Sequence, residues 1–443
     1  MKKVAIIGAG WMTKPLVDYL METCGYFVTV ANRTLSKAEA VIADRAGGKA
    51  VRWSTDETEI LDEVIREADL AISMVPKPVH VHVARACLRH GTHMLTTAYE
   101  IPELVALDEE ARQKGVLILN ELGEVPGMDH MGTQLVLDEI RQEGGRVISL
   151  NSYGSGLPAF EFNRNPMGYK FSWDPRTVFV AAQTPGAYLV EGKKIEVPGD
   201  KLFENFWLVD IEGLGTFESY PNKDVEKYVE PFGLDREKVS FYRGLLRFSG
   251  YCNNMRHMLA LGLIDSERER SFEGMSYRQF MASLVGAGPT DDIESAVAQY
   301  LGLDRLADII LRLKWLGLFE DLPIAVSKGA CLDVLLDRML ARMSYEPGER
   351  DMILLHVDAL AEFPDGRRER RLATMHVEGI PDGATAMSRA VALPAAISAR
   401  LVLEGEVQAS GARMPPNLPE LYKPALEELA RFGFEFKRRT VAA

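Results

Sequence analysis

The sequence predicts an α/β protein in which a doubly wound, Rossmann-type domain is followed by an α+β domain and a helical region. Residues 1 to 124 alternate short β-rich runs with helix-like segments, which is typical of a parallel sheet covered on both faces. The next part of the chain changes to strands and turns punctuated by glycine and proline. Residues 253 to 343 are helical in character.

The strands of the first domain are separated by amphipathic segments. We expect strands at Lys3 to Ile7, Phe27 to Ala31, Ala50 to Trp53, Leu70 to Val75, Met94 to Thr97 and Val116 to Asn120. Between them, TEILDEVIREA and IPELVALDEEARQKG place apolar residues at helical spacing, and Gly91 and Gly115 are stop signals. With right-handed crossovers these strands form a doubly wound sheet, which binds ligands at its carboxyl edge.

The rest of the chain predicts a second sheet and several helices. After GEVPGMDHM and a helix through Ile140, the segments VISLNSYGSGLPAF, GYKFSW and TPGAYLVEGKKIEVPG predict antiparallel or mixed strands. The segment ERDMILLHVDALAEFPDGRRERRLATMHVEG predicts a β-hairpin around Pro364, Asp365 and Gly366. A helix in TAMSRAVALPAAISARLVLEG and a final helix and strand ending FEFKRRTV follow. One consistent arrangement has the chain leave the nucleotide domain, build two insertions and return.

Composition narrows the class of partner. A chain of 443 residues is expected to form two or three domains, and its net charge of -13 with no long basic run argues against nucleic acid and anionic membranes as partners. No apolar run approaches the ~20 residues that span a bilayer, and MKKVAIIG leaves no room for a signal peptide. The four cysteines lack CxxC spacing, as free thiols in a reducing compartment do. We therefore expect a cytoplasmic protein with a small-molecule substrate.

The stretch VAIIGAGWMTKP predicts a dinucleotide site. Gly8 and Gly10 directly follow a strand and precede a helix, so the backbone can turn tightly and approach a pyrophosphate at the helix N-terminus. Thr13 stands where the GxGxxG pattern has its third glycine, and its hydroxyl can donate a hydrogen bond to a phosphate oxygen. A tight turn without a ligand is the alternative.

The end of the second strand, VTVANRT, selects between the two nicotinamide cofactors. NAD sites usually carry an acidic residue there for the ribose hydroxyl, whereas this chain has neutral Asn32 and cationic Arg33. A 2′-phosphate would meet a guanidinium and the hydroxyl of Thr34, which favours NADP(H). An exposed loop arginine is the alternative interpretation.

The histidine-rich segment HVHVARACLRHGTH, residues 80 to 93, raises the question of a metal site. His80 and His82 are two positions apart on a predicted helix and therefore point to different sides of it. We expect a solvated helix face and no bound metal.

Two further segments carry candidate chemistry. ELGEVPGMDH follows the sixth strand, where Asp129 is predicted to be a helix N-cap, to orient His130 as a proton donor, or both. Three cationic residues lie near tyrosines in the segments YPNKD and YRGLLRFSG, namely Lys223, Arg243 and Arg247. These cations suit the capture of substrate carboxylates, and ion pairing at the surface is an equal alternative.

Over essentially its whole length the chain resembles the saccharopine reductase family, the NADP-dependent, L-glutamate-forming saccharopine dehydrogenases. The matching segments are GAGWMTKP, VTVANRT, LTTAYE, GEVPGMDHM, GLPAFEFNRNPMGYKFSW, YPNKD, RGLLRFSGY, KWLGLFED, GERDMILL and YKPALEEL. The resemblance implies an NADP-binding Rossmann domain (1–124 plus 393–443), an α/β substrate and dimerisation domain (125–252 plus 344–392) and a helical insertion (253–343). It also implies a homodimer, and a reaction of lysine metabolism: aminoadipate semialdehyde, L-glutamate and NADPH give saccharopine, or the reverse.

The resemblance also assigns residues to roles by position. The family's cofactor contacts, together with Gly8, fall on Gly10, Trp11, Met12, Thr13, Asn32, Arg33, Thr34, Val75, Thr97, Ala98, Glu124, Val125 and Pro126. Its substrate contacts fall on Ala98, Tyr99, Lys223, Leu245, Leu246 and Arg247. If the reaction uses a proton donor from the protein, we expect Tyr99 or His130. A threonine at the third glycine position is normal in the family.

Four departures from the family pattern lie near the substrate. GLDPG becomes GEVPG, so Val125 replaces an aspartate and the carboxylate moves to Glu124; YCGGLP becomes YGSGLP, with Gly154 for cysteine. Lys223 replaces an arginine, and Leu245 replaces a threonine. Two alternatives therefore stay open: a dehydrogenase of the same fold that oxidises another amine, such as lysine or a polyamine precursor, and a non-catalytic NADP-binding protein.

Overall fold

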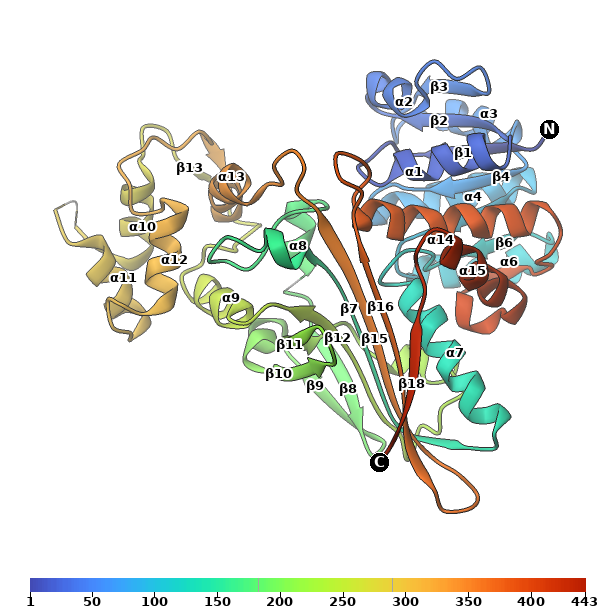
Figure 1. Cartoon of the computed structure of the whole chain (residues 1–443). Coiled ribbons are helices and arrows are strands. Elements are labelled where there is room, and N and C mark those ends of the chain that lie inside the picture. Colours follow the sequence, from blue (N-terminus) through green and yellow to red (C-terminus); the bar gives the residue numbers. More distant parts are fainter. Residues whose placement is uncertain (182, 289) are drawn as a thin grey trace. The chain divides into compact units, whose positions relative to one another are not determined.

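The computed structural model describes residues 1–181, 183–288 and 290–443, and the chain divides into two compact units (Figure 1). Unit 1 comprises Met1–Gly156, Lys227–Val239 and Met352–Ala443, and unit 2 comprises Leu157–Glu226 and Ser240–Asp351. The α/β class is confirmed. The helical segment 253–343 lies within unit 2. The division into three domains groups the residues differently and stays a prediction.

Unit 1 contains a parallel sheet with the strand order β17-β6-β5-β4-β1-β2-β3. Its strands are β1 (Lys3–Ile7), β2 (Phe27–Asn32), β3 (Gly48–Arg52), β4 (Leu70–Ser73), β5 (His93–Thr96), β6 (Leu117–Leu119) and β17 (Gly411–Arg413). The central strands β1 and β4 are buried on both faces, which is why their sequences are apolar runs without alternation. The order reverses between β1 and β4, so the switch point that binds ligands in such sheets lies there. The first six of these strands lie within two residues of the predicted bounds.

Helices from both ends of the sequence cover this sheet. The crossover helices are α1 (Thr13–Asp18), which continues as a π-helix over Tyr19–Thr23, α2 (Leu35–Ile42), α3 (Thr58–Arg66), the 3-10 turn Lys77–Val79, α4 (His80–His90), α5 (Pro102–Val105) and α6 (Asp108–Gln113). Helix α14 (Ala386–Leu403) packs against α1, β4 and β5, and α15 (Pro419–Arg431), after the 3-10 turn Pro415–Asn417, packs against α14 and α7 (Met128–Gln142) (Figure 1). Within the described residues, α14 is the helix long and apolar enough to cross a membrane, but 83% of it is buried, as in a core helix.

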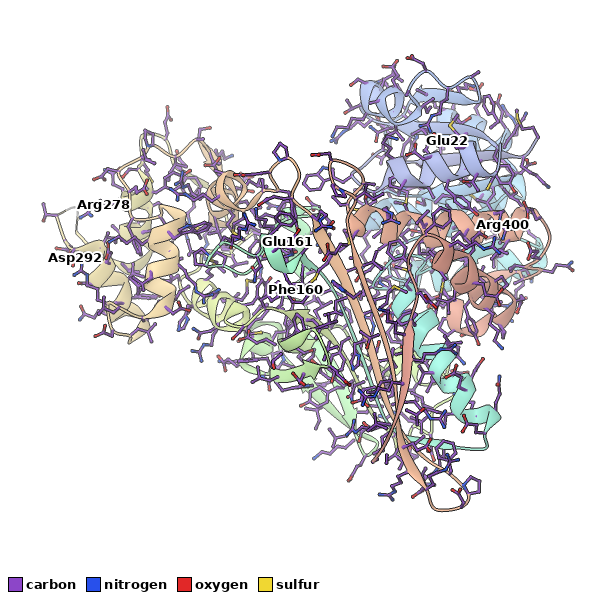
Figure 2. The ribbon with its side chains drawn as sticks, in the orientation of Figure 1. Glu22, Phe160, Glu161, Arg278, Asp292 and Arg400 are labelled. Atoms are coloured by element: carbon purple, nitrogen blue, oxygen red, sulfur yellow. The ribbon has the colours of Figure 1, made fainter. Side chains whose placement is uncertain are left out.

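Charged groups join the late helices to the first crossover. Arg400 of α14, labelled in Figure 2, donates a hydrogen bond of 2.9 Å to Glu428 of α15. The Tyr19 hydroxyl, on the π-helix that follows α1, donates to the other carboxylate oxygen of Glu428. The late segment is therefore an integral part of unit 1.

The remaining strands form antiparallel pairings in each unit. In unit 1, β7 (Arg146–Pro158), β15 (Asp351–Glu362), β16 (Arg368–Glu378) and β18 (Lys437–Ala442) follow one another in that order, and β15 with β16 is the predicted hairpin. In unit 2, β8 (Gly186–Val190) pairs with β9 (Lys193–Val197) and β12 (Ser240–Arg247), and β11 (Gly215–Pro221) lies between β10 (Trp207–Ile211) and β12.

Unit 2 also contains the predicted helical region. Its helices are α8 (Pro175–Ala181), α9 (Tyr251–Ala260), α10 (Tyr277–Val285), α11 (Ile293–Leu301), α12 (Asp308–Leu316) and α13 (Cys331–Met343), with 3-10 turns at Phe160–Phe162 and Gly199–Glu204 and a short strand pair, β13 (Arg270–Ser271) and β14 (Lys328–Gly329). The 3-10 turn Glu226–Tyr228 stands at the point where the chain re-enters unit 1. Helix α10 begins with a capping box, in which Ser276 accepts from the Gln279 N–H and Gln279 accepts from the Ser276 N–H.

Candidate functional site

The two glycines of the first loop play different roles. Gly8 has φ +112°, and a Cβ at this position would lie 2.5 Å from the carbonyl oxygen of Met74, so glycine is required by the protein itself. A Cβ on Gly10 would meet no protein atom within 4 Å. This open approach to the backbone, beside a Trp11 that is 60% exposed, fits a pyrophosphate.

Thr13 stabilises the loop through hydrogen bonds to the loop backbone. Its side chain is fully buried, and its hydroxyl accepts from the Gly10 N–H at 3.0 Å and donates to the Gly8 carbonyl at 3.4 Å. The structure thus gives this hydroxyl a different role from the predicted donation to a phosphate, because its single hydrogen is directed at the loop backbone.

The end of β2 presents the residues predicted to select NADP. The Asn32 side chain connects two segments, since its Oδ1 accepts from the Ala9 N–H at 3.1 Å and its Nδ2 donates to the Thr34 carbonyl at 2.9 Å. The Arg33 and Thr34 side chains are exposed directly after the strand. An exposed guanidinium held at the carboxyl edge, with no carboxylate in VTVANRT, fits a 2′-phosphate.

The loops after β4 and β5 meet the same edge of the sheet. Met74, which contacts Gly8, lies just before the half-buried Val75, and the Thr97 hydroxyl lies 3.8 Å from the sulfur of Met74. Ala98 follows, with its N–H bonded to the Thr96 hydroxyl at 3.2 Å. The structure therefore brings the predicted cofactor residues of β1, β4 and β5 together.

The loop after β6 carries GEVPG into α7. The Gly123 N–H donates to the Pro126 carbonyl at 2.8 Å, and the Val125–Pro126 peptide bond is cis. Glu124 is buried and Val125 is half-buried. Asp129 is not the N-cap that the sequence predicted: Gly127 caps α7, and the Asp129 carboxylate accepts from the Gly127 N–H at 2.7 Å.

His130 belongs to a buried polar cluster. Its side chain is 1% exposed, and its Nε2 lies 2.9 Å from Oε2 of Glu121, while the carboxylate of Asp129 is 3.8 Å from its Nδ1. Glu121 makes the closer contact, and Asp129 lies at the opposite ring nitrogen, so the hypothesis that Asp129 orients His130 stays a prediction. The ring packs 4.5 Å from that of Tyr228, between centroids. A histidine buried in this way serves the network more readily than it reaches a substrate.

Glu121 is the centre of that cluster. Its carboxylate is fully buried and accepts from Nζ of Lys227 at 2.7 Å, from the Tyr228 hydroxyl at 3.1 Å and from the Glu100 N–H at 3.0 Å. Burial alone disfavours the charged carboxylate, but the hydrogen bond and charge of His130 and those of Lys227 outweigh it and lower the pKa of Glu121 to about 2.

Lys227 connects the cluster to a predicted site residue. Its Nζ lies 5.2 Å from the ring centroid of Tyr99, which is half-buried directly after Ala98. The sequence reasoning missed Glu121 and Lys227. The one available signal was the position of Glu121 directly after the sixth strand, whereas nothing in the sequence connects it with a lysine 106 positions later.

Unit 2 contains the predicted substrate arginine in an aromatic setting. Arg247 is 4% exposed, and its Nη2 donates to the Tyr220 hydroxyl at 3.1 Å. Its guanidinium carbon lies 5.4, 5.6 and 4.9 Å from the ring centroids of Tyr169, Tyr220 and Tyr251. Arg243 is 2% exposed. The alternative of surface ion pairing is therefore wrong for both arginines.

The other predicted substrate residues of unit 2 flank Arg247 or precede it. Leu245 is half-buried and Leu246 is buried, and their side chains point to opposite faces of β12 because strand residues alternate. Leu245 therefore shares a face with Arg247, whereas Leu246 does not. Lys223 has φ +64° and is half-buried, and its carbonyl accepts from the Ala187 N–H at 2.9 Å.

The histidine-rich helix is structural. His80 is 2% exposed and its Nδ1 lies 2.8 Å from the Ser73 hydroxyl, so the expected solvated face is wrong for this residue. Burial lowers the pKa of His80 to about 4. His90 pairs with Asp62 at 2.9 Å. Across residues 1–181, 183–288 and 290–443, no group of three or more His, Cys, Asp or Glu side chains is arranged to hold a metal ion.

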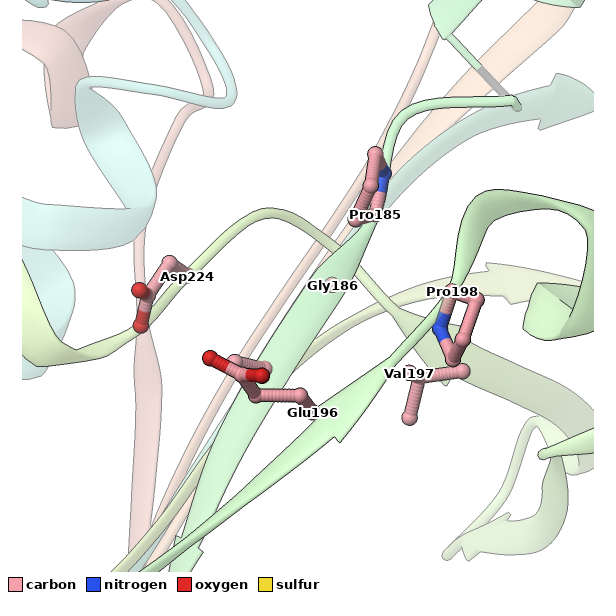
Figure 3. Close-up of a pocket in the computed structure, with 7 residues that line it drawn as sticks. Pro185, Gly186, Glu196, Val197, Pro198 and Asp224 are labelled. Carbon is pink, nitrogen blue, oxygen red and sulfur yellow. The ribbon is translucent and has the colours of Figure 1, made fainter.

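A separate pocket of about 250 Å³ lies in unit 2 (Figure 3). It is lined by Pro185, Gly186, Ala187, Glu196, Val197, Pro198 and Asp224, none of which is a predicted site residue. Its two carboxylates, Glu196 and Asp224, are 3.6 and 2.7 Å from the ammonium of Lys194. Both carboxylates thus already have a cation partner within the protein, and nothing here indicates a ligand.

Comparison with known families decides the assignment. Residues 4–119 match the saccharopine dehydrogenase NADP binding domain, and residues 123–434 match the saccharopine dehydrogenase C-terminal domain. The chain belongs to the saccharopine dehydrogenase family. The predicted family, its NADP cofactor and its oxidoreductase class are therefore confirmed, and the residues around Gly10 and Arg33 fit that cofactor.

Individual relatives of this saccharopine dehydrogenase family protein match over the full chain. The NADP(+), L-glutamate-forming saccharopine dehydrogenases of Schizosaccharomyces pombe and Saccharomyces cerevisiae are 31% and 32% identical, and cover 100% of this chain and 99% and 100% of their own. The mitochondrial alpha-aminoadipic semialdehyde synthase of Bos taurus is 31% identical over 98% of this chain, but over only 47% of its own length. The solved apo structure of the S. cerevisiae L-Glu-forming enzyme superposes with a TM-score of 0.89 at 30% identity, with both chains fully covered.

Two of the departures from the family pattern lie against each other. A Cβ on Gly154 would be 2.5 Å from Cγ2 of Val125 and 2.8 Å from Cδ2 of Leu355. The two changes are therefore sterically coupled: the valine methyl fills the space that a side chain at position 154 would need.

Proposed function

We propose that this protein interconverts saccharopine with aminoadipate semialdehyde and L-glutamate, using NADP(H). The observation that carries the proposal is the full-length match to L-glutamate-forming saccharopine dehydrogenases, combined with a nucleotide loop that fits the cofactor. In this reaction NADPH supplies a hydride to the carbon of a C=N bond, or NADP⁺ accepts one from saccharopine.

The residues of unit 1 support the cofactor half of this proposal. Gly8 allows the tight turn of the loop, Gly10 lets the pyrophosphate approach the backbone, and Arg33 pairs with the 2′-phosphate. The remaining predicted contacts line the same carboxyl edge, from Val75 and Thr97 to the segment Glu124, Val125 and Pro126. These contacts orient the nicotinamide, and much of the rate comes from that positioning.

The substrate half rests on cations and aromatic groups. Arg247, desolvated among three tyrosines, binds a substrate carboxylate strongly, since a buried guanidinium gains more from an anion than an exposed one does. Tyr99 is a better candidate for a proton donor than His130. The Tyr99 side chain is half-buried, whereas that of His130 is only 1% exposed and is bonded to Glu121. A protonated imine needs only a hydride, so a strong protein acid is unnecessary. A homodimer in the cytoplasm completes the proposal.

The test is NADPH consumption with L-glutamate and aminoadipate semialdehyde, compared with a panel of other amine and carbonyl pairs. We expect turnover with the first pair. Consumption only with another pair would assign a different amine to the site, and NADPH binding without any turnover would indicate a non-catalytic protein.

Cofactor selection is tested by Arg33→Ala. Charge-assisted hydrogen bonds to phosphate contribute about 1.5–3 kcal/mol, so NADPH should bind about 10- to 100-fold more weakly. NADH affinity should be unchanged, because NADH lacks the 2′-phosphate. Arg112→Ala, which removes an arginine that pairs with Asp108 on α6, is the matched control and should alter neither affinity. An equal loss for both cofactors in Arg33→Ala would refute the assignment.

A further inference from the structure

The ammonium of Lys227 lies at the carboxyl edge of the Rossmann sheet, beside the loops that follow β5 and β6. Its side chain is 35% exposed, although its Nζ is 2.7 Å from the fully buried carboxylate of Glu121. The same Nζ lies 4.6 Å from the ring centroid of Tyr228 and 5.2 Å from that of Tyr99. A cation is thus fixed beside Tyr99, in the loop that follows strand β5.

Glu121 fixes the position of this cation relative to the β5 loop. The Glu121 N–H donates to the Ala98 carbonyl at 3.1 Å, and the Glu100 N–H donates back to the Glu121 carboxylate at 3.0 Å. The loops after β5 and β6 are therefore joined on both sides of Tyr99. The ion pair with this carboxylate, which accepts from the Glu100 N–H, keeps the Lys227 ammonium beside Tyr99.

Lys227 retains hydrogen-bonding capacity. An ammonium has three N–H donors, and in the part of the chain that the structure describes Glu121 is its hydrogen-bond acceptor. The carboxylate of Glu121, by contrast, is also bonded by His130 and Tyr228. The ammonium of Lys227 is therefore held in place by Glu121 but is partly exposed and can donate further hydrogen bonds.

We propose that Lys227 is a substrate-positioning residue that binds a carboxylate of the amino-acid substrate beside Tyr99. This inference rests on the proposed function, which supplies a substrate with several carboxylates. Glu121 acts through Lys227 by holding it in place. No proton or electron is transferred by Lys227 in this role; it lowers the free energy of the bound substrate.

The first experiment separates substrate binding from cofactor binding. Lys227→Met should raise the KM for saccharopine about tenfold or more, as expected for a lost charge-assisted hydrogen bond, and leave the Kd for NADPH within twofold. Lys227→Arg should restore much of the loss. Lys114→Met, which removes another lysine ion pair from the same unit, should change neither value. An unchanged KM in Lys227→Met, or a parallel loss of NADPH affinity, would overturn the proposal.

The second experiment excludes a merely structural role. If Lys227 only balances the charge of Glu121, the double variant Glu121→Gln/Lys227→Met should regain the wild-type KM. If Lys227 binds substrate, the KM stays raised. Retained NADPH binding shows that each variant is folded.

A binding measurement keeps this inference distinct from the proposed reaction. Calorimetric titration of L-glutamate into the protein with NADPH bound requires no turnover. Weaker binding to Lys227→Met than to the wild type supports the proposal even if saccharopine is not turned over, which would overturn the proposed function alone. Equal binding to both, or no binding to the wild type, overturns the role of Lys227.

Discussion

Exchanging each glycine of the first loop for alanine should separate folding from cofactor binding. In Gly8→Ala the new methyl group would lie 2.5 Å from the carbonyl oxygen of Met74, and the backbone would keep an alanine at φ +112°. The Met74 carbonyl cannot retreat easily, because the Met74 N–H is bonded to the Ile7 carbonyl at 2.8 Å, next to the paired strands β1 and β4. Backbone strain of about 1–3 kcal/mol adds to an overpacking cost of about 1–3 kcal/mol. The sum is about 2–6 kcal/mol.

Gly10→Ala is the matched variant, because its methyl group would meet no protein atom within 4 Å. It should leave the melting temperature unchanged but weaken NADPH binding, since the methyl group occupies the approach to the pyrophosphate. Gly8→Ala should lower the melting temperature by at least about 4 °C, at about 2 °C per kcal/mol for a unit of this size.

Thermal melts without cofactor, and titrations of NADPH followed by tryptophan fluorescence, measure both effects. A melting temperature that falls equally in the two variants would refute the division of roles. So would unchanged NADPH affinity in Gly10→Ala.

Three further outcomes follow from the packing and the buried charges. Gly154→Ala should cost about 1–3 kcal/mol of unfolding free energy in a urea melt, and Val125→Ala in the same chain should recover part of it; additive losses would contradict the steric coupling. Burial lowers the pKa of His80 to about 4, so the stability that His80 contributes is present above pH 6.5 and is lost as the pH falls towards 4. Between pH 7 and pH 5 the wild type should therefore lose about 2 kcal/mol more of its unfolding free energy than His80→Gln does. Equal losses would show that His80 titrates normally. The pKa of Glu121 is lowered to about 2, so the stability that this carboxylate contributes is present above about pH 4.5 and is lost as the pH falls towards 2. In urea melts between pH 5 and 3, the unfolding free energy of Glu121→Gln should therefore fall less than that of the wild type.

The nucleotide loop could be predicted from the sequence because its determinants are local. Gly8, Gly10 and Arg33 each lie within a few residues of the strand that positions them. A parallel sheet brings the carboxyl ends of its strands to one edge, so finding the strands was enough to place the site. The hairpin of β15 and β16 was predictable for the same reason, since its turn residues and alternation are contiguous.

The predictions that were wrong concern the partners of polar groups. The hydroxyl of Thr13 and the carboxylate of Asp129 both bond to backbone groups in their own loops, and the sequence does not state which donor or acceptor lies nearest. The spacing of His80 and His82 correctly placed them on different sides of a helix, but it did not indicate which of these sides faces the sheet. The pairing of Glu121 with Lys227 spans 106 positions, and charged residues of this kind are ordinarily exposed.

The pairing of β17 with β6 affects the order in which the protein can fold during synthesis. The family model of the NADP-binding domain ends at residue 119, yet the edge of its sheet is completed by residues 411 to 413, and α14 covers α1, β4 and β5. A nascent chain of the first 119 residues would leave that apolar face open while nearly 300 further residues are translated, which takes about 15–60 s at about 5–20 residues per second. We therefore expect a fragment of residues 1–119 to aggregate when expressed alone, and the intact chain to depend on chaperones or on its intervening segments until α14 emerges.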